Sequence, residues 1–127
     1  MASLMTTLGL QNSADRDSLA SPPARRQAMS FDDSNTVFSA ASTTLGSPTN
    51  LISKATTNSR AGNVQTYQAV LASTDFNGVT IRRFAVHNIA TPTGVSATVE
   101  IGVDGQGIVK NNTYALTVTI NITYASP

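Results

Sequence analysis

The stretch Tyr114-Ala-Leu-Thr-Val-Thr-Ile-Asn-Ile-Thr-Tyr124 decides the fold class of this chain. Its even positions carry large apolar or aromatic side chains, and its odd positions carry Ala, Thr and Asn. Alternation over this length is typical of a β-strand with one buried and one solvated face. In a helix, at 3.6 residues per turn, the same apolar groups would be scattered around the axis. We therefore predict that this strand is the centre of the core.

Shorter segments with strand character precede this stretch, and Gly, Asn, Asp and Pro separate them. The predicted strands cover residues 36–39, 51–56, 64–72, 79–88, 95–103 and 108–110. In residues 79–88 the apolar alternation changes phase at Arg82-Arg83, which predicts a β-bulge there. About seven or eight short strands without a convincing helix predict an all-β fold, an antiparallel β-sandwich or jelly-roll-like domain over residues 31–127.

Residues 1–30 differ from the remainder of the chain. They contain Pro22-Pro23 and several paired charges, and no hydrophobic period is sustained. One interpretation is a disordered tail, because such a segment buries little apolar surface. The other, which we favour, is an extended N-terminal arm held by a partner subunit. Deletion of residues 1–30 would then leave a folded β-domain that assembles poorly.

Composition limits the possible classes of protein. The 127 residues suffice for one domain plus a short segment, and only 12% of them are charged. The net charge of +1 gives no reason to expect nucleic acid or a membrane surface as a partner. The chain has no cysteine, and no apolar run reaches the length of a membrane span. The N-terminus lacks the layout of a signal peptide, so we expect a soluble, unprocessed protein made in a cytoplasm.

No residue pattern indicates an enzyme. His87 is the only histidine, and it lies at a strand end, where a hydrogen-bonded structural role is the common one. The acidic residues match neither a calcium loop nor a pair of catalytic carboxylates. The glycine-rich residues 102–107 precede a strand and not a helix, which argues for a turn and against a phosphate loop. We expect no catalytic residue, no metal and no cofactor.

The last third of the chain resembles a group of known proteins. The strings TIRRFAVHN, VDGQGIVK and YALTVTINITY are similar to those of small all-β structural proteins in the virions of tailed bacteriophages. In that group a strand, a loop, a VDGQ turn and a closing Thr-rich strand follow one another. The resemblance carries over no functional residues, because its motifs mark strands and turns.

The resemblance implies a virion structural protein, and we expect foremost a capsid decoration (cement) protein that stabilises the particle. The alternative is a neck, collar or tail-fibre module that binds host-surface glycan through loops at residues 40–50 or 89–94. In both cases the partners would be other virion proteins, namely the major capsid protein or neck and tail proteins. We expect a homo-oligomer such as a trimer, made in the host cytoplasm and located in the virion.

With so few charges, we expect the contacts with partners to use apolar side chains and backbone pairing at strand edges. The candidate edges are residues 36–39 and 51–56. The predicted partner-binding residues are Leu4, Leu8, Leu10, Arg25, Arg26, Arg82 and Arg83.

Overall fold

The computed structural model describes residues 2–18, 26–87, 95–100 and 107–124, which contain ten strands and one helix. The elements, in chain order, are β1 (Ala2–Met5), α1 (Thr7–Ser18), β2 (Ala28–Asp32), β3 (Leu51–Ala55), β4 (Thr57–Ala61), β5 (Val64–Leu71), β6 (Thr80–Ile81), β7 (Arg83–His87), β8 (Val95–Glu100), β9 (Ile108–Val109) and β10 (Leu116–Thr123).

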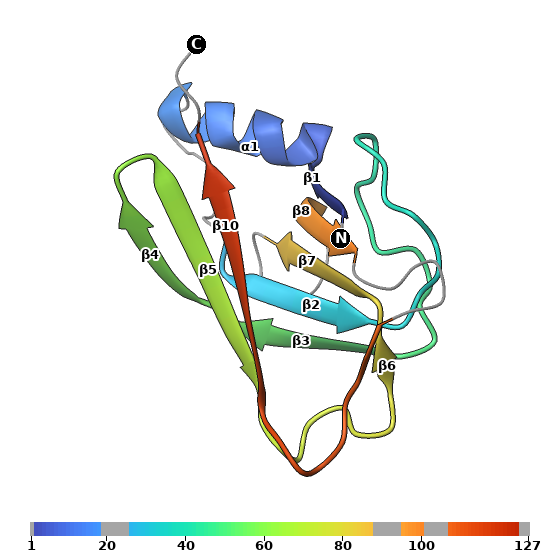
Figure 1. Ribbon diagram of the computed structural model, residues 1–127. Helices are drawn as coiled ribbons and strands as arrows, with labels where there is room; N and C mark the ends of the chain where they lie inside the picture. Colours follow the sequence, from blue (N-terminus) through green and yellow to red (C-terminus); the bar gives the residue numbers. More distant parts are fainter. Residues whose placement is uncertain (1, 19–25, 88–94, 101–106, 125–127) are drawn as a thin grey trace.

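The strands form three antiparallel sheets. A five-stranded sheet has the order β1-β8-β7-β2-β3, a three-stranded sheet has the order β10-β5-β4, and β6 pairs with β9. Figure 1 shows β5 and β10 running at a steep angle to β2 and β3, with α1 above them. The predicted all-β, antiparallel class is confirmed. The finer assignment to a sandwich or jelly roll stays a prediction.

The main core lies between the two larger sheets. Phe31 of β2 and Phe84 of β7 meet edge to face, with ring centroids 5.5 Å apart. The other buried members of this cluster come from both sheets and from β6: Met29, Tyr67, Ala69, Leu71, Ile81, Val86, Ile120 and Ile122. Each sheet thus removes the apolar face of the other from water, which is the main stabilising term for such layers.

The chain crosses from one sheet to the other at Thr56. β3 pairs with β2 and ends at Ala55, whereas β4 begins at Thr57 and pairs with β5. The backbone N–H of Thr56 donates to the carbonyl of Gln27 at 2.9 Å, which holds the bend. A strand that changes sheets at a corner is a feature of sheets packed at a large angle.

The strand β10 confirms the predicted alternation and corrects its predicted place. Ile120 and Ile122 are buried, and the intervening Thr and Asn side chains are exposed. However, β10 is an edge strand of the three-stranded sheet. The strands buried along their whole length are β2 and β7 in the larger sheet. A strand covered on both faces does not alternate, so the clearest alternation marks a surface strand and not a central one.

The opposite face of the five-stranded sheet is covered by the segment between β2 and β3. Phe38 and Leu45 from this segment pack with Ala85 and Val95 in a second buried cluster. The strand predicted at residues 36–39 is wrong, because Phe38 belongs to a loop that follows the turn made by Ser34 and the Asp32 carboxylate.

The described part of residues 1–30 is not an extended arm. β1 pairs with β8 at the edge of the five-stranded sheet, and α1 packs against β8. Thr6 caps the helix, because its hydroxyl accepts from the N–H of Gly9 at 3.0 Å and donates to the carbonyl of Val95 at 2.6 Å. β2 begins at Ala28, so the expected boundary at residue 31 would divide a central strand.

The phase change near Arg82 has a different origin from the bulge predicted there. β6 ends at Ile81 and pairs with β9, and β7 begins at Arg83 in another sheet. Ile81 and Phe84 still reach the same core, as the phase change required. The register shift within the sheet lies between Val86 and His87.

Candidate functional site

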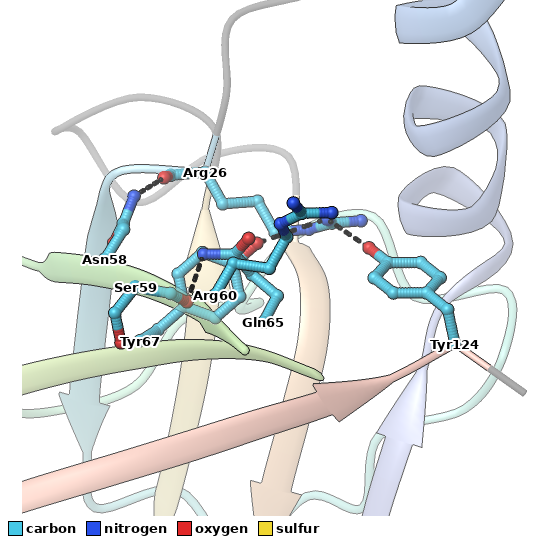
Figure 2. Close-up of a pocket in the computed structure, with 7 residues that line it drawn as sticks. All are labelled: Arg26, Asn58, Ser59, Arg60, Gln65, Tyr67 and Tyr124. Carbon is cyan, nitrogen blue, oxygen red and sulfur yellow. Dashed lines mark hydrogen bonds between the residues drawn. The ribbon is translucent and has the colours of Figure 1, made fainter. Parts of the chain in front are cut away.

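The inner face of the three-stranded sheet changes from apolar to polar toward one end, and a pocket of about 350 Å³ lies there. Along β5 the inward side chains run from Leu71 and Ala69 to Tyr67 and then to Gln65. The pocket is lined by Arg26, Asn58, Ser59, Arg60, Gln65, Tyr67 and Tyr124, as Figure 2 shows.

The β4–β5 hairpin places Asn58 and Arg60 on this inner face. The turn lies at Gly62, whose positive φ of 59° favours glycine, and at the adjacent Asn63. The register then pairs Asn58 with Tyr67 and Arg60 with Gln65. Residues paired in antiparallel strands point to the same face, so the turn position determines which side chains enter the pocket.

Arg26 is the buried centre of the site, with 2% of its surface exposed. Its Nη2 donates to the carbonyl of Gly9 at 2.9 Å and to Oγ of Ser13 at 2.8 Å, which joins it to α1. Its Nη1 lies 3.3 Å from the hydroxyl of Tyr124 and 3.5 Å from that of Tyr67. The Nε has no hydrogen-bond partner among the described residues. Arg26 thus links the helix to β5 and to Tyr124, the residue after β10, through neutral groups.

The pocket carries two positive charges and, among the described residues that line it, no negative one. No ion pair joins Arg26 or Arg60 to a described acid. In Figure 2 both arginine side chains extend toward the same region, near Tyr124. A buried cation without a counter-charge is costly, and an anionic group would reduce that cost. The arrangement is therefore suited to hold a group rich in hydrogen-bond acceptors.

Arg83, predicted to bind a partner, is instead engaged inside the protein. Its Nε and Nη2 donate to the two oxygens of the Asp32 carboxylate, each at 2.8 Å. It also donates to the carbonyls of Thr36 and Leu45, and its guanidinium lies 4.1 Å from the ring centroid of Phe38. Arg83 thus fastens the covering loop to the sheet.

The other predicted partner-binding residues are dispersed. Leu4 is half-buried and packs against the second cluster. On α1, Leu8 is half-buried, whereas Leu10 is 57% exposed and available to a partner. Arg82 is half-buried and has an interaction within the chain. Arg25, like the predicted glycan-binding loop at residues 89–94, lies outside the described residues.

His87 lies at the end of β7, as expected, and its Nε2 is 2.8 Å from Oγ of Ser30 on β2. The strand register that brings the two together was not visible in the sequence. Both side chains are buried, so this hydrogen bond holds adjacent strands together.

The outer face of the three-stranded sheet is a second candidate surface, which we name the neutral face. It consists of Thr57, Ser59, Ala61, Val64, Thr66, Gln68, Val70, Thr117, Thr119, Asn121 and Thr123. None of these side chains is charged, and several pair across strands: Thr66 donates to Asn121 at 2.7 Å and Gln68 donates to Thr119 at 3.2 Å. Such a surface can pack against another protein without desolvating charge.

Within the described residues, no helix is both long and apolar enough to cross a membrane. The same part of the chain holds no group of three or more His, Cys, Asp or Glu side chains placed to bind a metal ion. Comparison of the chain with protein-family models, curated proteins and solved structures finds no match.

Proposed function

We propose that the chain is a bacteriophage virion structural protein, foremost a capsid decoration protein that stabilises the particle. The observation that carries the proposal is the free edge of β10. Within the described part of the chain β10 pairs with β5 alone, and Leu116–Thr123 contains no charge and no proline. Charges, prolines and bulges are the devices that protect exposed edges from pairing with other chains.

Two of the other edges of the larger sheets carry a charge, Lys54 on β3 and Arg60 on β4. The edge strand β1 is uncharged as well, but it has only four residues, whereas β10 has eight. A very short edge strand offers little backbone for pairing with another chain. The edge of β10 also adjoins the neutral face, so a strand of a neighbouring subunit could add to the sheet while its side chains rest on uncharged groups. Strand addition of this kind joins subunits through backbone hydrogen bonds, and symmetry repeats each contact many times in a particle.

The proposal predicts how the protein is attached. Particles of the phage that encodes the chain are purified on a density gradient and washed, and the pellet is assayed for the protein. We expect it to remain bound in 1 M sodium chloride, because backbone pairing and apolar burial are little affected by screening. Guanidinium should release it. Loss of the protein in salt alone would contradict attachment through the β10 edge.

Two variants locate the contact. Thr117→Lys places a charge on the free edge strand, and Thr57→Lys places the same charge on the same face at the opposite edge of the sheet. Both positions are exposed, so both variants should fold. We expect Thr117→Lys to lower incorporation into particles roughly tenfold, equivalent to about 1.4 kcal/mol, and Thr57→Lys to incorporate normally. Equal incorporation of the two variants would refute the role of β10.

A specific observation also favours the alternative, a neck, collar or tail-fibre module. The pocket around Arg26 and Arg60 has the volume of a small-ligand site and is lined by polar and aromatic side chains. Binding of host-surface glycan would use such a site. The number of copies per particle separates the alternatives, since a shell protein is present in far more copies than a neck or tail protein.

A further inference from the structure

We infer that the pocket at the end of the three-stranded sheet binds an oxyanion, a carboxylate or a phosphate ester, carried by a ligand of about the size of a monosaccharide. The inference does not depend on the proposed place in a virion. It rests on three features of the described residues: two unneutralised guanidinium groups, two tyrosine hydroxyls and a pocket of about 350 Å³ between them.

The first feature is the charge of Arg26. This side chain is almost fully buried, its four hydrogen bonds all go to neutral acceptors, and its Nε is unsatisfied. Buried charges in proteins are usually paired, and removal of a charge from water without pairing is strongly unfavourable. An anion in the adjoining pocket would supply the counter-charge that the described residues do not provide.

The second feature is Arg60, which would make the direct contact. It is exposed, projects from β4 on the inner face, and forms no hydrogen bond or ion pair through its side chain with a described residue. A guanidinium presents two parallel N–H groups to a carboxylate or phosphate. The guanidinium of Arg60 is thus available to a ligand at the entrance of a pocket that Arg26 already makes positive.

The third feature is the pair of tyrosines. The hydroxyls of Tyr67 and Tyr124 lie near Nη1 of Arg26 as acceptors, which leaves their own O–H groups free to donate. The Oε1 of Gln65 remains as an acceptor, because the Nε2 of that residue donates to the carbonyl of Ser59 at 2.8 Å. The site therefore offers donors for an oxyanion and an acceptor for a hydroxyl beside it.

Isothermal titration with four probes tests the inference: glucuronate, glucose 6-phosphate, inorganic phosphate and glucose. We expect both charged sugars to bind in the millimolar range or tighter, and neutral glucose to bind at least tenfold more weakly. If inorganic phosphate binds as tightly as glucose 6-phosphate, the oxyanion alone is recognised. If inorganic phosphate binds more weakly, the sugar contributes to the affinity. Failure of all three anions to bind at 10 mM would overturn the inference.

Variants tie the binding to this pocket. Arg60→Gln removes an exposed charge and should weaken binding of glucuronate roughly tenfold or more, as expected for hydrogen bonds to a charged group. Tyr124→Phe should weaken it by a smaller factor. Lys54→Gln is the matched control, because it removes one positive charge at a distance from the pocket. Equal weakening by Arg60→Gln and Lys54→Gln would show a nonspecific charge effect and refute the site.

Discussion

Arg83 and Asp32 show how a chain with few charges can bury two of them. The carboxylate meets both ends of the guanidinium fork, and the remaining donors reach two loop carbonyls. A buried ion pair is tolerated when every polar atom has a partner. The pair holds the loop at residues 33–50 on the sheet. This loop in turn covers the second buried cluster.

Removal of either Arg83 or Asp32 alone should therefore lower the stability of the fold substantially. We predict that Arg83→Met lowers the free energy of unfolding by about 3–5 kcal/mol, because the Asp32 carboxylate would stay buried without a counter-charge. The double variant Asp32→Leu with Arg83→Met should recover most of the loss. The control is Lys54→Met, which breaks the more exposed ion pair with Asp75, also 2.8 Å long, at a cost of about 0–1 kcal/mol. Urea denaturation measures all three, and similar losses for the two single variants would contradict this role.

The ion pair of Lys54 with Asp75 should also make the stability of the fold depend on pH. The hydrogen bond from Lys54, with one from the backbone of Ala72, holds the pKa of Asp75 below its ordinary value of 3.8. A carboxyl with a lowered pKa in the folded state contributes stability above its unfolded pKa, and this is lost as the pH falls through the folded value. The difference in melting temperature between the protein and Asp75→Asn should shrink between about pH 5 and pH 2. A constant difference would show that the charge of Asp75 does not stabilise the fold.

The role of a single residue was mispredicted where its interaction partner is distant in the sequence. Arg82-Arg83 was interpreted as a solvated bulge or an inter-subunit contact. Arg83 is buried because Asp32 lies opposite it in the strand register, 51 positions away. The register of β2 and β7 was not predicted, so this partner could not be named. The sequence predicts a turn over residues 58–63, whereas the turn is confined to Gly62-Asn63 and residues 57–61 form β4. The shorter turn is what puts Arg60 and Tyr67 on one face.

At the scale of elements, residue propensity and hydrophobic pattern predict correctly those strands that have one solvent-exposed face. β5 and β10 begin and end within two residues of the predicted ranges 64–72 and 114–124. The helix α1 was not predicted, since its sequence is polar and has only a weak apolar stripe. Its one local signal is the capping threonine, Thr6.

The faces of β10 can be tested by substitutions at adjacent residues. Ile120→Asp would bury a carboxylate in the main core, and we expect it to cost about 3 kcal/mol or more. Thr119→Asp lies on the neutral face, where a carboxylate can still accept from Gln68, and should cost no more than about 0.5 kcal/mol. Melting temperatures compare the two variants. Equal losses would mean that the assigned faces are wrong.

At the scale of the whole molecule, the N-terminal segment is part of the fold. β1 extends the larger sheet, α1 receives two hydrogen bonds from Arg26, and β2 lies between β7 and β3. A polar composition was interpreted as an independent arm because the strands that it pairs with are far away in the sequence. Only the fold as a whole shows that these residues complete a sheet.

The expected effect of N-terminal deletion is therefore reversed. A variant that lacks residues 1–18 should lose several kcal/mol, because it loses β1 and the helical partners of Arg26. A variant that lacks residues 1–30 also loses three of the five residues of the central strand β2 and should not fold. Circular dichroism and urea denaturation report on both. Cooperative unfolding of the second variant with a native-like spectrum would show that residues 1–30 are dispensable.

The central claim, that the chain is a repeated structural subunit of a phage particle, is tested most directly by its copy number. Calibrated peptide mass spectrometry on gradient-purified particles gives the ratio of this chain to the major capsid protein. We expect a count on the order of hundreds per particle, as for a subunit repeated by the symmetry of a shell. On the order of a dozen copies would favour the neck or tail alternative instead. Absence of the chain from purified particles would contradict the account.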